Sequence, residues 1–136
     1  MEFKNKYGRV VLERDHSIII GHFHGNINAN LVCQFSNSIF EHIKPFAGRP
    51  WAYICNSYTA CAATPEAEEQ FTHLAKQMMQ RNCIASAYIL GSSLVVNQMQ
   101  RIMNNAGLMI DIKSRLFADL YQAKEHINEQ LKLLTC

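Results

Sequence analysis

The stretch "WAYICNSYTACAATPEAEEQF", residues 51–71, passes from one hydrophobic pattern to another. Its first five residues, 51–55, form a short apolar run that is typical of a buried strand. Further on, Thr64, Pro65 and Glu66 favour a helix start, because Thr caps free N–H groups, Pro suits the first helical position and acids complement the helix dipole. The stretch therefore predicts a strand, a polar loop and a helix in succession, which is the repeating unit of an α/β sheet.

Outward from this stretch the same two patterns recur. β-Branched and apolar runs that read as strands occupy residues 9–13, 17–23, 51–55, 83–90 and 108–112. Apolar residues at helical spacing mark four helices: one capped at Asn26 or Asn28 and ended by Pro45, one from Thr64, one after residues 91–93, and a last one between Phe117 and Leu134. The predicted order is ββαβαβαβα, an α/β fold with a mixed sheet of about five strands covered by helices. Residues 1–136 are expected to form a single domain.

Composition narrows the class of protein. Hydrophobic residues make up 49% and charged residues 18% of the 136 residues, which is enough apolar material for one core and too little charge for a disordered chain. The net charge of +2 comes from scattered basic residues, so binding to nucleic acid is not expected. No apolar run reaches the ~20 residues of a transmembrane segment. Five cysteines without a Cys-x-x-Cys pair indicate a reduced, cytoplasmic protein.

Two quoted pieces carry a family resemblance. The first is "GRPWAYICN" (48–56) followed by "TPEAEEQF" (64–71), and the second is the ending "LFADLYQAKEHINEQL" (116–131). Together with the order of elements, they resemble the SpoIIAA-like branch of the STAS superfamily over roughly residues 8–134. The resemblance implies a regulatory or binding module, with no enzymatic activity and no cofactor. Anti-sigma-factor antagonists of that superfamily present a phosphorylatable serine in an Asp-Ser-Ser-Gly turn. Residues 56–61 read "NSYTAC" instead, which argues against such a switch.

Polar residues follow two of the predicted strands. Because ligands of open α/β sheets gather at the carboxyl ends of the strands, these residues form the candidate site. They are Asn56, Ser57, Tyr58 and Thr59 after one strand, with Ser92 and Ser93 after the next. We call them the rim residues. Neighbouring helix N-termini would favour an anion there, so the expected partner is a protein or a small anionic ligand. The alternative is that these hydroxyl groups only cap helices and satisfy loop backbone.

The sequence offers further candidate sites. His22 and His24 share one face of a strand, but two histidines without further ligands do not make a zinc site, and the polar face of an edge strand is the favoured explanation. Cys61 is the best placed nucleophile for an enzyme that would use residues 56–61, although no partner base is evident. A Met-rich pair of helices would suit a lipid carrier of the Sec14 type, or an ordinary core. Neither a metal site nor catalytic residues are expected. Large apolar residues near expected edges predict a homodimer: Phe3, Tyr7 and Trp51.

Overall fold

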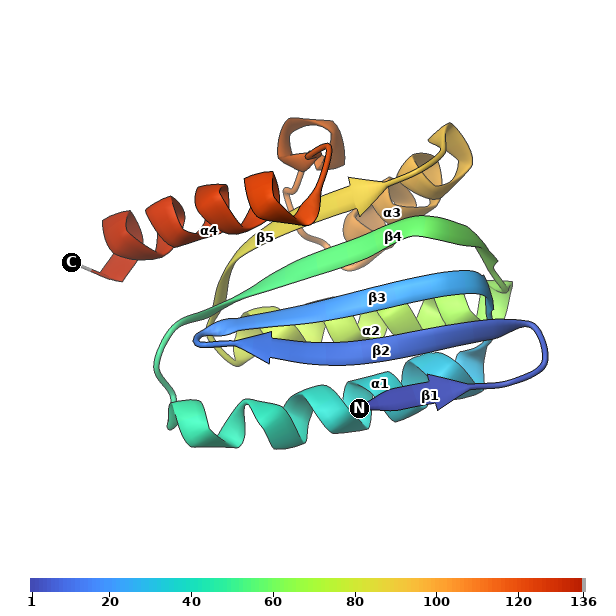
Figure 1. Ribbon diagram of the computed structural model, residues 1–136, viewed down its shortest axis with the longest axis horizontal. Helices are drawn as coiled ribbons and strands as arrows, with labels where there is room; N and C mark the ends of the chain where they lie inside the picture. Colours follow the sequence, from blue (N-terminus) through green and yellow to red (C-terminus); the bar gives the residue numbers. More distant parts are fainter. Residues whose placement is uncertain (136) are drawn as a thin grey trace.

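A computed structural model describes residues 1–135 of the chain. Its centre is one five-stranded sheet in which the strands lie side by side in chain order (Figure 1). The second strand is antiparallel to both the first and the third, and the third, fourth and fifth strands are mutually parallel. The strands are β1 (Glu2–Lys4), β2 (Gly8–Asp15), β3 (Ile18–Ile27), β4 (Trp51–Ala63) and β5 (Cys83–Leu90).

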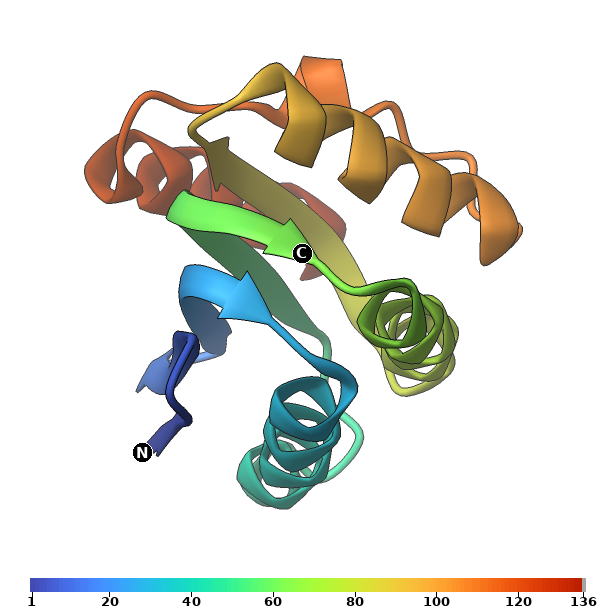
Figure 2. The same cartoon turned by 90° about the vertical axis from the view of Figure 1, so that its right-hand side faces the viewer.

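Four helices cover the sheet on both faces. The first three pack against one face, and the last lies on the opposite face over β4 and β5 (Figure 2). They are α1 (Ala29–His42), α2 (Pro65–Gln80), α3 (Ser93–Asn105) and α4 (Leu120–Thr135), with short 3-10 helices η1 (Lys44–Phe46) and η2 (Ile112–Arg115) between them. We call the side of α1–α3 the helix face. No helix of residues 1–135 combines the length and the apolarity needed to cross a bilayer.

The alternation of side chains along β4 divides the core into two layers. Trp51, Tyr53 and Cys55 are buried on the helix face, where they join the side chains of α1, α2 and α3. Ala52 and Ile54 point the other way and pack under α4. A strand that is buried on both faces reads as a continuous apolar run, and this is the pattern that residues 51–55 show.

The mixed α/β sheet and the four helices confirm the predicted fold class, but β4 is longer than predicted. Residues 56–61 were expected to form a loop, and the structure continues the strand to Ala63. Pairing with β3 continues this far through two register shifts, and Gln98 of α3 hydrogen-bonds both the N–H and the C=O of Ala63. These backbone partners come from segments remote in sequence, so local polarity did not reveal them.

The strand predicted at residues 108–112 is wrong. Its residues alternate between inward and outward positions, yet no strand pairs with them. The side chain of Gln100 instead donates to the C=O of Ile110 and accepts from the N–H of Ile112, at 2.8 and 2.9 Å. A single side chain therefore satisfies the backbone that a neighbouring strand would have paired. The fifth strand of the sheet is β1, which was not predicted.

Two further expectations about edges are corrected. The strand that carries His22 and His24 is β3, which is the central strand of the sheet and not an edge. Trp51 was expected near an edge as a dimer contact, but its side chain is buried and its indole N–H donates to the C=O of Arg81 at 2.7 Å. Of the three residues on which the predicted homodimer was based, Trp51 is therefore buried in the core.

Candidate functional site

The rim residues come together where β5 ends alongside the middle of β4. Ser57 pairs with Leu90 in the parallel ladder, and the next residue, Gly91, lies so close to the carbonyl oxygen of Tyr58 that there is no space for a Cβ. Ser92 and Ser93 follow directly at the start of α3. The two polar segments that the sequence singled out are therefore neighbours, as the parallel arrangement of their strands requires.

The four rim residues of β4 do not share one direction. Asn56 and Thr59 point to the face that carries α4, beyond the part that this helix covers, because they hydrogen-bond His22 and His24 of β3. Ser57 points to the helix face, is only 4% exposed and lies 3.2 Å from the Sγ of Cys55. Tyr58 is 64% exposed. Ser57 is consequently a core residue, and it cannot contact a partner directly.

On the face that carries α4, beyond the part that this helix covers, a chain of hydrogen bonds runs from β2 to β4. The backbone N–H of Tyr58 donates to Oδ1 of Asn56, at 3.4 Å, which orients the amide so that Nδ2 donates to Nδ1 of His22, at 3.1 Å. The other ring nitrogen, Nε2, then carries the proton and donates to Glu13, at 2.9 Å. The chain fixes the side chain of Asn56 and the backbone next to Tyr58. Sequence reasoning placed the two histidines on one face correctly but missed that they support the rim.

His24 supports the rim in the same way, through a hydrogen bond between its Nδ1 and Oγ1 of Thr59. Its pKa is lowered, first by partial burial and then by the positive charge of Arg9 and the proximity of His22. Partial burial and a positive neighbour both disfavour the imidazolium. The neutral ring is therefore the form that the fold prefers.

The helix N-termini at the rim are already capped. Oγ of Ser92 accepts from the N–H of Val95 at 3.2 Å, and Oγ1 of Thr64 accepts from the N–H of Ala67 at 3.1 Å. The first turn of α2 also carries Glu66 and Glu68. Capped N–H groups and nearby carboxylates leave little to attract an anion. The capping role, which was the alternative for the hydroxyl groups, is thus real for Ser92.

Large apolar side chains are exposed at this end of the sheet. Tyr58 is joined by Leu94, which is 61% exposed in the first turn of α3. Tyr7 is exposed in the turn between β1 and β2, where its carbonyl accepts from the N–H of Asn26 at the end of β3. The first turn of α3 and the turn between β1 and β2 both lie at the end of the sheet to which β3, β4 and β5 point (Figure 1). We call Tyr7, Tyr58 and Leu94 the apolar rim.

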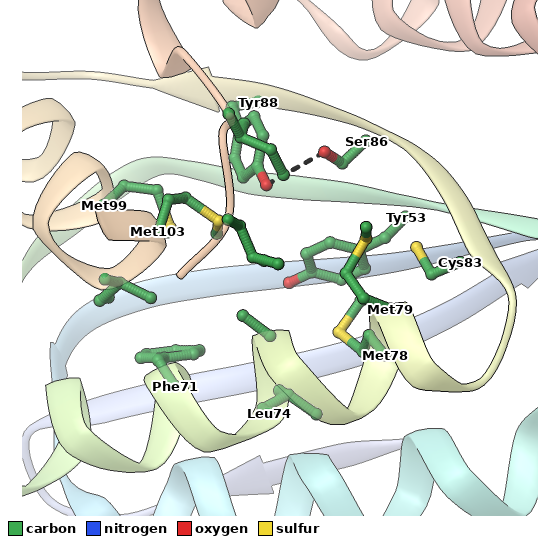
Figure 3. Close-up of a pocket in the computed structure, with 14 residues that line it drawn as sticks. Tyr53, Phe71, Leu74, Met78, Met79, Cys83, Ser86, Tyr88, Met99 and Met103 are labelled. Carbon is green, nitrogen blue, oxygen red and sulfur yellow. Dashed lines mark hydrogen bonds between the residues drawn. The ribbon is translucent and has the colours of Figure 1, made fainter. Parts of the chain in front are cut away.

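Cavities in the core are small. The larger one lies between α2, α3 and the sheet, and Figure 3 shows Tyr53 and the methionines of both helices around it. Its volume is about 50 Å³, and a second cavity beneath the rim, beside Ser57, has about 30 Å³. A carrier of drug-sized or lipidic molecules needs a pocket of roughly 300–1,000 Å³. Met78, Met99 and Met103 therefore pack as core, whereas Met79 is exposed.

The buried sulfhydryl and phenol groups in the core on the helix face favour their neutral forms. Burial raises the pKa of Cys55 to about 11 and that of Cys83 to about 12. Burial also raises the pKa of Tyr88, whose hydroxyl donates to Oγ of Ser86 (Figure 3). Cys33 and Cys61 are exposed, and all four thiols are free. Cys61 has no hydrogen-bonded base within the described chain. Cys136 lies outside the described residues.

No set of three or more His, Cys, Asp or Glu side chains in residues 1–135 is arranged to hold a metal ion. Both ring nitrogens of His22 are already engaged, by Glu13 and Asn56. These hydrogen bonds engage His22 without a metal ion. His22 and His24 therefore connect neighbouring strands of the sheet.

Comparison with known proteins supports the fold. No family model and no curated protein sequence matches the chain. Among solved structures, an uncharacterised protein of the DUF3478 family with a SpoIIAA-like fold, from Shewanella loihica, superposes with a TM-score of 0.66 at 12% identity, over 92% of this chain and 98% of that one. An anti-sigma factor antagonist from Mycobacterium paratuberculosis superposes with a TM-score of 0.59 at 7% identity, over 88% and 92%. This chain has the SpoIIAA-like fold.

Proposed function

We propose that this protein is a non-catalytic, regulatory binding module, and that it recognises a partner protein with the apolar rim and the exposed polar side chains beside it. The observation that carries the proposal is the exposure of Tyr58 and Leu94 on two segments that touch at Gly91. Exposed tyrosines on a well-ordered scaffold are typical of the residues that contribute most to protein interfaces.

The support beneath the apolar rim is rigid. The backbone of Tyr58 is held by Asn56, which the Glu13–His22 pair holds in turn, and Leu94 stands in a helix turn capped by Ser92. A preorganised surface loses little conformational entropy when it binds. Thr59 and Ser93, which are exposed beside Tyr58 and Leu94, supply hydroxyl groups for a polar border.

A protein is a better candidate partner than a small molecule. The cavity beneath the rim holds about 30 Å³, which is far below the roughly 300–1,000 Å³ of a ligand pocket. A small anion would meet capped helix ends and the carboxylates of Glu66 and Glu68. An enzyme that used Cys61 would need a base that the described residues do not place beside it. A surface without a pocket suits a macromolecular partner.

The solved anti-sigma factor antagonist is consistent with a regulatory role but does not extend it to this chain, since at 7% identity the likeness concerns the fold. The cytoplasm is part of the proposal, in keeping with the four free thiols. Homodimerisation also stays a prediction. Light scattering at high micromolar concentration that returned the monomer mass would remove it.

Site-specific photo-crosslinking tests the proposal. A benzoylphenylalanine placed at Tyr58, in cells that naturally make the protein, should trap a discrete partner. Tyr121 is the matched control, because it is also a tyrosine, is 70% exposed and belongs to α4 on the opposite face of the sheet from α3. Leu94→Ala in the Tyr58 crosslinking protein should reduce the yield several-fold. Equal products from both positions, or none from Tyr58, would show that the rim is not the binding surface.

A further inference from the structure

In the described part of the chain, no strand pairs with the outer edge of β5 over residues 83–87. β5 is the last strand of the sheet, and in residues 1–135 the only pairing on its outer side is the single bridge between Tyr88 and Leu116. The N–H of Phe117 donates there to the carbonyl of Tyr88. Because backbone groups two residues apart point the same way along a strand, the N–H and C=O of Ser86 also point outward. No strand covers them.

The open part of the edge is the floor of a groove. On the helix-face side, Met79, Leu108 and Ile110 border a cleft of about 270 Å³. On the α4 side, His126 and Gln130 border a cleft of about 230 Å³. Residues 84–86 line both clefts, so the strand edge runs between them. Met79 and Met109 are exposed on the apolar wall, which gives that wall flexible side chains able to fit different partners.

Arg115 gives the groove its charge. It borders both clefts, and its Nη1 donates to Oγ of Ser86 at 3.0 Å, which holds the guanidinium at the strand edge. It forms no ion pair with any carboxylate in the described part of the chain. No acidic residue lines either cleft. A half-buried guanidinium whose other four N–H donors have no partner among residues 1–135 is a recognition group for a carboxylate.

We propose that residues 83–87 of β5 bind an extended segment of a partner protein, which adds a strand to the sheet and places an Asp or Glu side chain on Arg115. Unpaired strand edges recognise peptides in this way, with backbone hydrogen bonds for affinity and side-chain contacts for specificity. The apolar wall selects apolar or β-branched neighbours for the acid. A second copy of this chain does not fit, because two-fold pairing of the β5 edges brings two Arg115 side chains together without an acid between them.

This surface is separate from the apolar rim, and its test does not depend on the rim. Random twelve-residue peptides displayed on phage are selected on the immobilised protein and, in parallel, on Arg115→Gln. Enriched peptides should carry an Asp or Glu between apolar or β-branched residues. A synthetic enriched peptide should shift the amide signals of residues 84–86 in NMR spectra of the labelled protein.

Two matched changes isolate the charge. Arg115→Gln should weaken binding of the synthetic peptide about tenfold, the scale of one charge-assisted hydrogen bond. Lys113 is an exposed residue of η2 outside the groove, so Lys113→Gln should leave the affinity unchanged. Replacing the acidic residue of the peptide by the corresponding amide should lower the affinity by the same factor. Because this change leaves the protein unaltered, it separates the loss of charge pairing from any effect of the Arg115 variant on folding. Enrichment of peptides without an acid, equal enrichment on Arg115→Gln, or shifts confined to the rim would overturn the proposal. So would concentration-dependent dimerisation that moves the signals of residues 84–86.

Discussion

Gly21→Ala should destabilise the protein, although alanine is intrinsically better than glycine in a strand by about 0.5–1 kcal/mol. Gly21 lies in β3 and faces α1, and a Cβ there would stand 2.7 Å from Cζ of Phe35, 2.8 Å from Cε2 of Phe23 and 3.0 Å from the hydroxyl oxygen of Tyr53. Ordinary contact begins at 3.4 Å, so the nearest ring must move by 3.4 − 2.7 = 0.7 Å. All three rings are buried, and Phe23 packs edge-on against Phe35 with 5.0 Å between ring centroids.

Overpacking of this kind costs typically about 1–3 kcal/mol, which exceeds the gain in strand propensity. We therefore expect a net loss of roughly 1–2 kcal/mol in the free energy of unfolding. Urea denaturation followed by fluorescence would show the midpoint falling by roughly 0.5–1 M at an unchanged slope of about 2 kcal/mol/M. Gly21 does not have a positive φ, so backbone strain does not enter the comparison.

The double variant Gly21→Ala with Phe35→Leu is the control. Shortening the ring removes its end from the path of the new methyl group, so the combined loss should be smaller than the sum of the two single losses by roughly 1 kcal/mol. Additive losses would show that the Phe35 ring is not the obstacle. A stabilised Gly21→Ala variant would refute the close packing of this site altogether.

Three further predictions concern the titratable and metal-binding side chains. At pH 8, iodoacetamide should modify the two exposed thiols of the described chain quickly, while Cys55 and Cys83 react only on unfolding, because burial raises their pKa to about 11 and about 12; peptide mass spectrometry that found them equally labelled in the native protein would contradict this. The pKa of His24 is lowered in the folded state, so its contribution to stability is present above pH 6.5, the ordinary pKa of histidine, and is lost as the pH falls through the lowered pKa. His24→Asn should therefore make the free energy of unfolding less dependent on pH below 6.5. An unchanged pH profile in thermal denaturation would count against the pKa shift. Elemental analysis of untagged protein should find no stoichiometric zinc, and one equivalent that disappeared when His22 and His24 were both replaced by Ala would show that the pair is a metal site.

Much of the fold follows from local chemistry. Thr64, Ser92 and Asn28 cap helices where the sequence indicates, because capping depends only on residues two or three positions away. The apolar runs 51–55 and 83–90 read as strands because a strand that is buried on both faces must be apolar on both. The alternation at "GHFHG" places both histidines on one face for the same local reason.

What the sequence did not reveal depends on partners far along the chain. Residues 56–63 extend as a strand because β3 pairs with them, and residues 108–110 do not form one because the side chain of Gln100 hydrogen-bonds the segment. The sequence neighbours of these segments contain no sign of either partner.

The candidate site shows the same division. The sequence placed the rim residues at the ends of two parallel strands, since strand order and direction follow from alternating strands and helices. Only the tertiary structure decided that Ser57 is buried beside Cys55 and that Tyr58 is exposed. It also decided that Asn56 and Thr59 hydrogen-bond His22 and His24. Two register shifts between β3 and β4, next to His24 and after Gly25, change which side chains face which side. A shift of one residue reverses the face of every side chain beyond it, and it is determined by pairing between strands and not by the local sequence.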